Sequence, residues 1–342
     1  MAITTIFSNE IDEDDNNLEK YFDKLQILNQ SVWDNICNRP QIVKWLEQFT
    51  GSIISEEEEQ KYMLFALSKF MYFSQRMVRE MLISLYRDII RAPIIQKIRR
   101  DNKDTTDYEL LSNLYSDSLN ATRFIGVGNP AESGAHLLYI FRQVNSLETK
   151  LFCDLHGAFD IEIKSDENII DWKARDEDIK KYIFFDDFVG GGTQASRYLE
   201  KPIASIRKRY PDVELLFISL FSTSQGLNKL NQENLFNGKA SCLFELDDTF
   251  KSCSSGARYF DKSPSWFSLD TFRNIATYYG SSLYEQPLGH GDCELLLGFS
   301  HNTPNNTLPI FWKNSSTNGV VAHWYPVFER FDKNYGLPRR VK

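Results

Sequence analysis

The sequence predicts an α/β fold, in which a mostly parallel sheet with helices on both faces is preceded by an N-terminal α-helical region. From about residue 120, uniformly apolar stretches such as "YIFFDD" alternate with amphipathic stretches such as "TQASRYLEKPIASIRKRY". Strands that are apolar on both sides are typical of parallel sheets covered on both faces. In the first hundred residues, apolar side chains recur at helical spacing instead.

The first hundred residues carry a helix start signal and a helical periodicity. Ser55 precedes the acidic run "EEEEQ", which is the pattern of a capped helix start. Pro93 and the basic "KIRR" after it mark the end of this segment, and the polar "RDNKDTTD" is the expected linker. We therefore expect a helical region over residues 1–105 and an α/β domain with a C-terminal extension over residues 106–342. The apolar positions expected to pack between helices are Leu64, Leu67, Phe70, Met71, Met77, Val78, Met81, Leu82, Leu85 and Ile89.

The α/β part is expected to begin with a short strand, "RFIGVG", which runs into the turn-rich "NPAESG". The highly charged "KSDENIIDWKARDEDIK" (164–180) is expected to form a long, mobile loop. The other predicted strands are "KLFCDL", "YIFFDD", "VELLFISLFS", "KASCLFEL" and "CELLLGFS", and the predicted helices are "AHLLYIFRQVN", "TQASRYLEKPIASIRKRY", "GLNKLNQENLF" and "LDTFRNIATYY".

Composition and charge argue against several function classes. The net charge of −8 gives no general attraction for nucleic acid. The N-terminus has no basic-then-apolar signal pattern, and charged residues interrupt the most apolar helical stretch, so we expect a cytoplasmic protein without membrane spans. The five scattered cysteines have no paired zinc spacing, even at "CDLH" (153–156), and are expected to be reduced thiols.

The stretch "FFDDFVGGGTQAS" (184–196) carries the clearest functional signal. Two aspartates end an apolar strand, three glycines follow, and a threonine opens a helix. Paired carboxylates accept hydrogen bonds from a ribose diol, whereas the amides of a glycine turn at a helix start face an anion. The turn lacks the lysine of a Walker A loop and the spacing of a dinucleotide fingerprint. A ribose 5-phosphate fits both halves of the stretch, and the alternative is a tight strand-to-helix turn with two solvated aspartates.

The same stretch resembles the phosphoribosyl-diphosphate signature of type I phosphoribosyltransferases, in which two acids and a short bridge lead to a Gly-Gly-Thr ending. It departs from that signature at Gly190, where a threonine often stands. The resemblance implies a type I phosphoribosyltransferase fold and a bound Mg²⁺, held by the two aspartates directly or only through the ligand. The resemblance implies that Asp186 and Asp187 are catalytic residues that contact the ribose. It also implies that the 5′-phosphate is bound by Gly190, Gly191, Gly192 and Thr193.

A second segment stands where that family receives diphosphate, in the loop after the first core strand. This segment is "GVGNPAESG" (126–134), and the resemblance gives the diphosphate contacts to Gly128, Ser133 and Gly134. Glu132 would repel diphosphate unless Mg²⁺ or a basic group offsets its charge.

The charged residues at 164–181 stand where the family has its flexible catalytic loop. The resemblance implies that Lys173 and Arg175 close over the diphosphate as further catalytic residues.

A narrower resemblance covers most of the chain. The helical N-terminal region, the two motifs above, "LGFSHNTPNNTLPIFW" (297–312) and "WYPVFER" (324–330) are similar to those of phosphoribosyltransferase-like effector proteins of bacterial conflict and anti-phage systems. Some of these proteins accompany retron reverse transcriptases. The implied partners are phosphoribosyl diphosphate or a nucleotide, together with a reverse transcriptase and its RNA–DNA product or a DNA-binding protein.

The loop "HNTPNNTLPIFW" has two interpretations. The amides of Asn305 and Asn306 could read a nucleobase on which Trp312 or Trp324 stacks. Alternatively, the loop is a proline-rich connection with its asparagines in turns and its tryptophans in the core.

Three functions follow from these patterns. The first is an enzyme that acts with Mg²⁺ on a phosphoribosyl donor or nucleotide, transferring or cleaving at the ribose anomeric carbon as the effector of an anti-phage defence system. The second is a catalytically inactive sensor of a phosphoribosyl ligand. The third is an interaction module whose helical region docks a partner protein or nucleic acid.

Overall fold

The structure of the chain is a computed structural model that describes residues 18–128, 133–164, 169–314 and 323–331. Glu132, one of the residues singled out in the sequence, lies outside these ranges.

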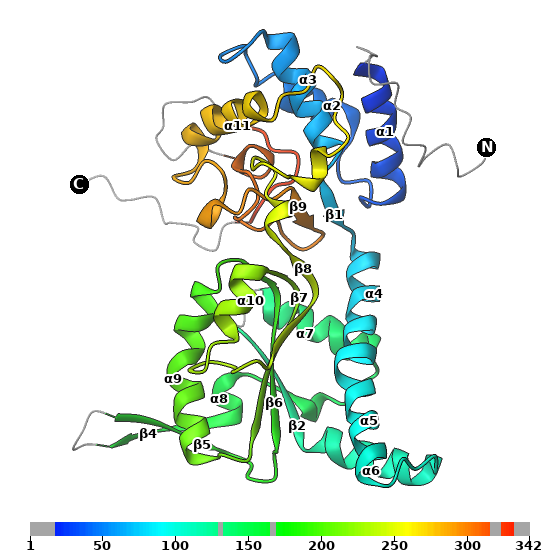
Figure 1. Cartoon of the computed structure of the whole chain (residues 1–342), viewed down its shortest axis with the longest axis vertical. Coiled ribbons are helices and arrows are strands. Elements are labelled where there is room, and N and C mark those ends of the chain that lie inside the picture. The colour runs from blue at the N-terminus through cyan, green and yellow to red at the C-terminus, as the bar shows by residue number, and fades with distance from the viewer. Residues whose placement is uncertain (1–17, 129–132, 165–168, 315–322, 332–342) are drawn as a thin grey trace. The chain divides into compact units, whose positions relative to one another are not determined.

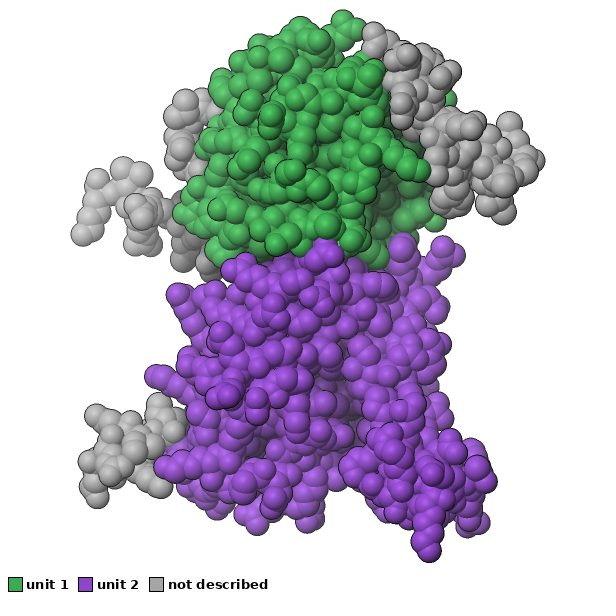
Figure 2. Space-filling model, in the orientation of Figure 1, with its two compact units in different colours: residues 1–75, 248–342 green, residues 76–247 purple. Residues whose placement is uncertain are grey.

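The chain folds into two compact units (Figure 2). Unit 1 consists of residues 1–75 and 248–342, and unit 2 consists of residues 76–247. This division differs from the boundary expected near residue 105. The α/β class and the helical character of the N-terminal region are confirmed.

Unit 1 contains helices from both ends of the chain and one two-stranded parallel sheet. The hydroxyl of Ser55 accepts a hydrogen bond from the Glu58 amide at the start of a helix, so the expected capped helix start is confirmed. The main elements of this unit are α1 (Leu18–Ser31), α2 (Arg39–Leu46), α3 (Glu56–Leu67), β1 (Met71–Phe73), α11 (Leu269–Leu283) and β9 (Leu297–Phe299).

The core of unit 1 explains why the domain boundary could not be found locally. The indole of Trp45 in α2 donates a 2.8 Å hydrogen bond to the carbonyl of Ile310, which is 265 residues further along the chain. Phe49 packs edge-to-face on Trp324 with ring centroids 5.4 Å apart, and Trp33 does the same on Phe328 at 5.3 Å. The apolar faces of the N-terminal helices are therefore buried by the C-terminal part of the chain.

The helical periodicity expected from residue 64 to residue 89 is interrupted. Helix α3 ends at Leu67, and β1 follows and pairs in parallel with β9, with Tyr72 opposite Gly298. The predicted strand "CELLLGFS" thus contributes β9 to unit 1 and not to the large sheet. Pairing between distant segments overrides a local helical pattern.

Unit 2 is built on a five-stranded parallel sheet with the strand order β3-β2-β6-β7-β8. Along the chain, a helix follows each of β2, β3, β6 and β7, whereas β8 leads on into the C-terminal part of unit 1 (Figure 1). The strands are β2 (Thr122–Gly126), β3 (Phe152–Cys153), β6 (Lys181–Val189), β7 (Glu214–Thr223) and β8 (Ala240–Leu246).

Helices cover both faces of this sheet (Figure 1). On one face, Phe141 of α7 packs against Phe124 of β2 and Phe185 of β6. On the other face, Leu199 and Ile203 share a buried cluster with alternate residues of the strands. The covering helices are α7 (Ser133–Val144) on the first face and α8 (Leu155–Ala158), α9 (Thr193–Arg209) and α10 (Ser224–Leu230) on the second.

A helical run precedes the sheet and ends at Asp101, next to the basic "KIRR" and at the start of the polar linker expected from the sequence. It consists of α4 (Gln75–Leu85), a π-helical segment (Tyr86–Arg91) and α5 (Ala92–Asp101), and α6 (Tyr108–Asn120) follows. Pro93 lies in the first turn of α5, where its missing N–H costs little. Within the described ranges, no helix is both long and apolar enough to cross a membrane.

The segment expected to be a long loop at 164–180 contributes half of a β-hairpin. Strands β4 (Phe159–Lys164) and β5 (Ile169–Ala174) pair antiparallel, and Figure 1 shows them extending away from the sheet. Charged and apolar residues alternate along both strands, so that apolar residues lie opposite each other, as Ile161 does opposite Trp172. The abundance of charge concealed this period of two.

Candidate functional site

The two predicted ligand segments follow neighbouring strands of the sheet in unit 2. The chain passes from β2 to β3 on one side, returns to β6 on the other side of β2, and then continues outward to β7 and β8. The direction of winding therefore reverses between β2 and β6. Ligands of open α/β sheets bind beyond the carboxyl ends of the strands at this point. The described part of the first segment, residues 126–128 and 133–134, therefore lies beside the end of β6, where segment 186–193 begins.

Asp186 and Asp187 lie at the carboxyl end of β6. Asp186 is half-buried and Asp187 is buried. One carboxylate oxygen of Asp186 accepts the Asp187 amide at 2.9 Å, and one of Asp187 accepts the Phe188 amide at 2.9 Å. Consecutive residues of a strand face opposite sides of the sheet, so a ligand that meets both carboxylates must approach past the end of β2, whose pairing with β6 stops at Phe185.

The glycine turn has one glycine that the fold requires and one that it does not. Gly192 has a φ of +69°, and a Cβ added there would come within 3.1 Å of the Gly226 carbonyl oxygen. Both features exclude most side chains at Gly192. At Gly191, in contrast, no described atom lies within 4 Å of an added Cβ. The absence of a side chain at Gly191 leaves open space beside the turn.

Helix α10 holds the glycine turn in place. The hydroxyl of Thr223 donates to the Gly190 carbonyl at 2.9 Å and accepts from the Gly226 amide at 3.0 Å. Gly226 permits this approach, because an added Cβ would lie only 2.0 Å from the Gly190 carbonyl oxygen. One helical turn further, the ammonium of Lys229 donates to the hydroxyl of Thr193 at 3.1 Å.

Sequence reasoning missed Lys229, because no short motif joins it to the glycine turn. The available signal was the "TSQG" sequence after a core strand, in which a capping threonine and a glycine place the next helix against a neighbouring loop.

The row of side chains beside Asp186 continues with one buried and one half-buried residue on the neighbouring strands. Ser219 is opposite Asp186 in β7, and its hydroxyl is fully buried without a hydrogen-bond partner in the described part of the chain. Cys242 is opposite Ser219 in β8. Burial, and then the charge of Glu245, raise the pKa of the Cys242 thiol to about 11. A neutral thiol is a poor nucleophile, so Cys242 is not suited to covalent catalysis.

The segment predicted to receive diphosphate is partly explained by packing. Gly128 has a φ of +98°. A Cβ added at Gly134 would lie 2.9 Å from the Val127 carbonyl oxygen and 3.3 Å from that of Phe185. The first turn of α7, which begins at Ser133, therefore packs closely on the ends of β2 and β6. Close packing therefore explains the glycine at position 134, whether or not this residue contacts a ligand.

The structure does not bring Lys173 and Arg175 to the glycine turn. Lys173 lies 3.9 Å from a Glu162 carboxylate oxygen, and Arg175 forms a 2.9 Å ion pair with Asp160, both across the β4–β5 hairpin. The amide of Trp172 donates to Ser205 in the C-terminal half of α9. Because an α-helix rises 1.5 Å per residue, this contact is about 18 Å along α9 from its first residue.

The predicted base-binding residues belong to unit 1, where they support the packing interpretation. Trp312 is 1% exposed, and its indole donates to the Thr307 carbonyl at 2.7 Å. Asn306 is buried and donates to the His290 carbonyl at 2.8 Å, and the Asn305 amide nitrogen is 3.4 Å from the Tyr284 hydroxyl. Trp324 is also buried. In this conformation, neither tryptophan offers a ring face to a base.

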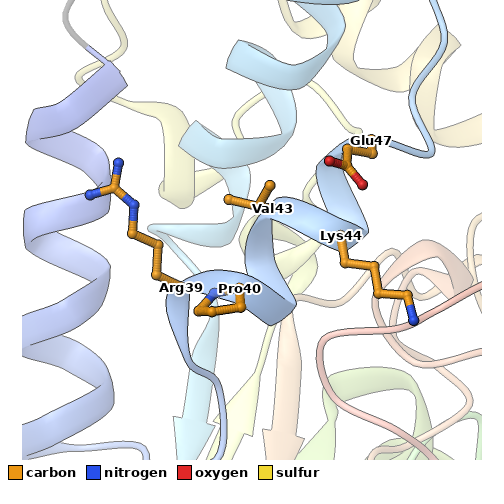
Figure 3. A pocket seen from close by; sticks show the side chains of 5 residues that line it. All are labelled: Arg39, Pro40, Val43, Lys44 and Glu47. Carbon is orange, nitrogen blue, oxygen red and sulfur yellow. The ribbon is translucent and has the colours of Figure 1, made fainter.

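An open surface pocket of about 580 Å³ lies on α2 of unit 1 (Figure 3). Both basic side chains of the pocket already have partners. Arg39 forms an ion pair with Glu19 at 2.6 Å, and the Lys44 ammonium lies 3.3 Å from the ring centroid of Tyr325. The remaining lining residues are Pro40, Val43 and Glu47. The pocket contains none of the residues singled out in the sequence.

The donor set at the end of β6 suits one kind of metal ion. Among the described residues, no group of three or more His, Cys, Asp or Glu side chains is placed to hold a metal ion. Mg²⁺ is commonly held by one or two carboxylates together with the phosphates of its ligand. Asp186 and Asp187 fit that mode of binding.

Comparison with known proteins agrees with the signature. The PRTase-CE family model matches residues 42–330. The chain belongs to the PRTase-CE family. PRTase abbreviates phosphoribosyltransferase, so membership in PRTase-CE confirms the resemblance at the level of the family. No curated protein matches the chain.

Solved structures similar to this PRTase-CE protein include two phosphoribosyltransferases. One is orotate phosphoribosyltransferase from Aeropyrum pernix, at 14% identity over 41% of this chain and 77% of that chain, with a TM-score of 0.23. The other is the xanthine-guanine-hypoxanthine phosphoribosyltransferase of Helicobacter pylori, at 14% identity over 41% of this chain and 84% of that chain, with a TM-score of 0.21.

Proposed function

We propose that the protein binds a phosphoribosyl ligand, either phosphoribosyl diphosphate or a nucleotide, at the carboxyl ends of β2 and β6, and that it transfers or cleaves at the ribose anomeric carbon. The observation that carries this proposal is the open space at Gly191, between a pair of carboxylates and the N-terminus of a 17-residue helix. A turn built only for folding needs a glycine at 192 but not at 191.

The 5′-phosphate would lie at the start of α9. The amides of the first turn and the helix dipole favour an anion there, and the Thr193 hydroxyl adds a hydrogen-bond donor. The ribose hydroxyls would donate to Asp186 and Asp187 at the end of β6. The diphosphate, or the base of a nucleotide, would then extend toward the end of β2.

Asp186 and Asp187, with the phosphates of the ligand, would hold Mg²⁺. The ion would supply neutralisation of the negative charge on the leaving diphosphate.

The protein's own residues orient the ribose so that an acceptor can reach the anomeric carbon. The acceptor's lone pair forms a bond to that carbon, and the bond from the carbon to the diphosphate oxygen breaks with its electron pair leaving on diphosphate. The acceptor loses its proton to solvent, and water is the acceptor in the cleavage reaction. When the ligand is a nucleotide, the bond that breaks is the one from the anomeric carbon to the base nitrogen, and the base leaves with that electron pair and takes up a proton. Positioning of the reactants and exclusion of other water molecules supply the rate enhancement.

A catalytically inactive sensor is the second candidate function. It is favoured by the position of Lys173 and Arg175, which pair with acidic residues across the hairpin and do not reach the glycine turn. We place either function in the cytoplasm as part of an anti-phage defence system, alongside a reverse transcriptase or DNA-binding partner, and the sequence resemblance at 297–312 and 324–330 supports that setting.

A turnover assay tests the proposal. Purified protein is incubated with phosphoribosyl diphosphate or nucleotides, with and without Mg²⁺, and released diphosphate and free base are measured. We expect turnover that Asp187→Asn reduces at least a hundredfold, because the variant loses a charged acceptor for a ribose hydroxyl. The matched control is Asp178→Asn, which changes an exposed residue just before the amino end of β6, at the opposite end of the strand from the site.

Each outcome of this assay decides between the candidates. Ligand binding without any product would establish the sensor. Unchanged turnover in Asp187→Asn would contradict the ribose site, and an interaction module would predict that wild-type protein binds none of these ligands.

A further inference from the structure

Lys229 supplies the glycine turn with a positive charge that its own sequence lacks. Its ammonium lies 3.1 Å from the hydroxyl of Thr193, the first residue of α9. The two residues are 36 positions apart, and they meet because β7 and β6 are neighbours in the sheet and α10 follows β7 directly.

The position of Lys229 is fixed by the same contacts that fix the turn. Gly226 packs on the Gly190 carbonyl, and residues three apart on a helix share a face, so Lys229 is on the side of α10 that meets the turn. Its Cβ lies 3.4 Å from a Cβ built at Gly192. The lysine stem is therefore packed along the turn and is half-buried.

No carboxylate of the described residues neutralises Lys229, whose one hydrogen-bond partner there is the Thr193 hydroxyl. A hydroxyl satisfies one of the three ammonium N–H groups, and it carries no charge. The start of α9 adds the positive end of a helix dipole at the same place. Two positive groups and a hydroxyl thus meet where the turn joins α9, at Gly192 and Thr193.

We propose that Lys229, which comes from a different segment than the glycine turn, binds the 5′-phosphate together with Thr193 and the amides of the turn. This inference rests on the proposed function, since it takes the phosphoribosyl ligand as given. It makes α10 a specificity determinant for a phosphomonoester over an unphosphorylated sugar. In a Walker A loop the lysine that contacts phosphate belongs to the loop itself, whereas here it comes from the next helix.

The competing explanation is that Lys229 only steadies the turn through Thr193. A hydrogen bond that only steadies the turn would act in the same way whatever the charge of a ligand. The two explanations differ in what Lys229→Arg does, since arginine keeps the charge, and in whether stability or affinity changes in Lys229→Ala.

The test is calorimetric titration of the full chain with ribose 5-phosphate and with phosphoribosyl diphosphate, at low and high salt. We expect Lys229→Ala to weaken both affinities at least tenfold, to reduce their salt dependence and to leave the thermal unfolding midpoint within about a degree. Lys229→Arg should recover part of the affinity. The matched control is Lys239→Ala, which removes an exposed lysine just before the amino end of β8, whereas the ligand site lies at the carboxyl ends of the strands.

Failure of this inference and failure of the proposed function give different results. If wild-type protein binds ribose 5-phosphate and Lys229→Ala binds it equally well, the role of Lys229 is wrong and the ligand site stands. A fall in the unfolding midpoint with unchanged affinity would assign Lys229 to the turn alone. If wild-type protein binds neither compound, the proposed function itself is wrong.

Discussion

Residues 186–193 of unit 2 and residues 305–312 of unit 1 both have the polar and aromatic composition of ligand-binding loops, but their polar groups are used differently. In the unit 1 segment, the side chains of Asn306 and Trp312 are buried and donate to main-chain carbonyls of the same unit. In the unit 2 segment, Gly191 borders open space and the nearby Lys229 has no carboxylate partner among the described residues. Residue types alone do not identify a binding loop; the deciding feature is whether the fold leaves room and charge beside them.

Trp312→Ala is expected to have the largest effect, because it opens a cavity in the core of unit 1. Loss of a buried tryptophan side chain costs about 3–5 kcal/mol of unfolding free energy. Denaturant unfolding measures this loss. Trp312→Phe is the matched control, which keeps most of the packing and should leave the affinity for phosphoribosyl diphosphate unchanged. A large loss of affinity in the phenylalanine variant, without a loss of stability, would restore the base-stacking interpretation.

Gly191→Ala and Gly192→Ala separate binding from folding within one turn. Gly192→Ala places a side chain at positive φ and should lower the free energy of unfolding by about 1–2 kcal/mol. Gly191→Ala meets no described atom, so its stability should stay within about 0.5 kcal/mol of wild type, while its affinity for phosphoribosyl diphosphate falls about tenfold.

Thermal unfolding and calorimetric titration of the same two proteins give the comparison. Equal affinity in wild type and Gly191→Ala would show that no ligand approaches the turn at that residue.

Cys242→Ser is expected to have the smallest effect on turnover. Burial raises the pKa of this thiol to about 11 from an ordinary value of 9.0, so it stays protonated through neutral pH and becomes a thiolate only as the pH approaches 11. Alkylation of Cys242 in the folded protein should therefore stay slow between pH 7 and 9 and accelerate above that range. Loss of turnover in Cys242→Ser would point to covalent catalysis instead.

The sheet of unit 2 and its signature were predictable because their signals are local. Strands β6 and β7 each contain a long apolar stretch, the acid pair belongs to β6, and the glycine turn follows that strand directly. The shared core of unit 1 was not predictable in this way, because Trp45 and Ile310 are 265 residues apart. Lys229 was missed for the same reason, since only the pairing of β6 with β7 brings α10 to the turn.

The hairpin shows a different kind of limit. Its alternation of charged and apolar residues was present in the sequence, but the number of charges favoured a loop over a strand. Cross-strand ion pairs such as Arg175 with Asp160 become visible only once the register is known.

Binding of the 5′-phosphate at the glycine turn can be measured by amide hydrogen exchange of the full chain, with and without phosphoribosyl diphosphate and Mg²⁺. We expect the ligand to slow exchange at the amides of residues 190–194, where the turn and the start of α9 would hold the 5′-phosphate, and to leave exchange in the buried residues 306–312 unchanged. Protection at 306–312 without protection at 190–194 would contradict this expectation, as would a ligand that binds and protects neither segment.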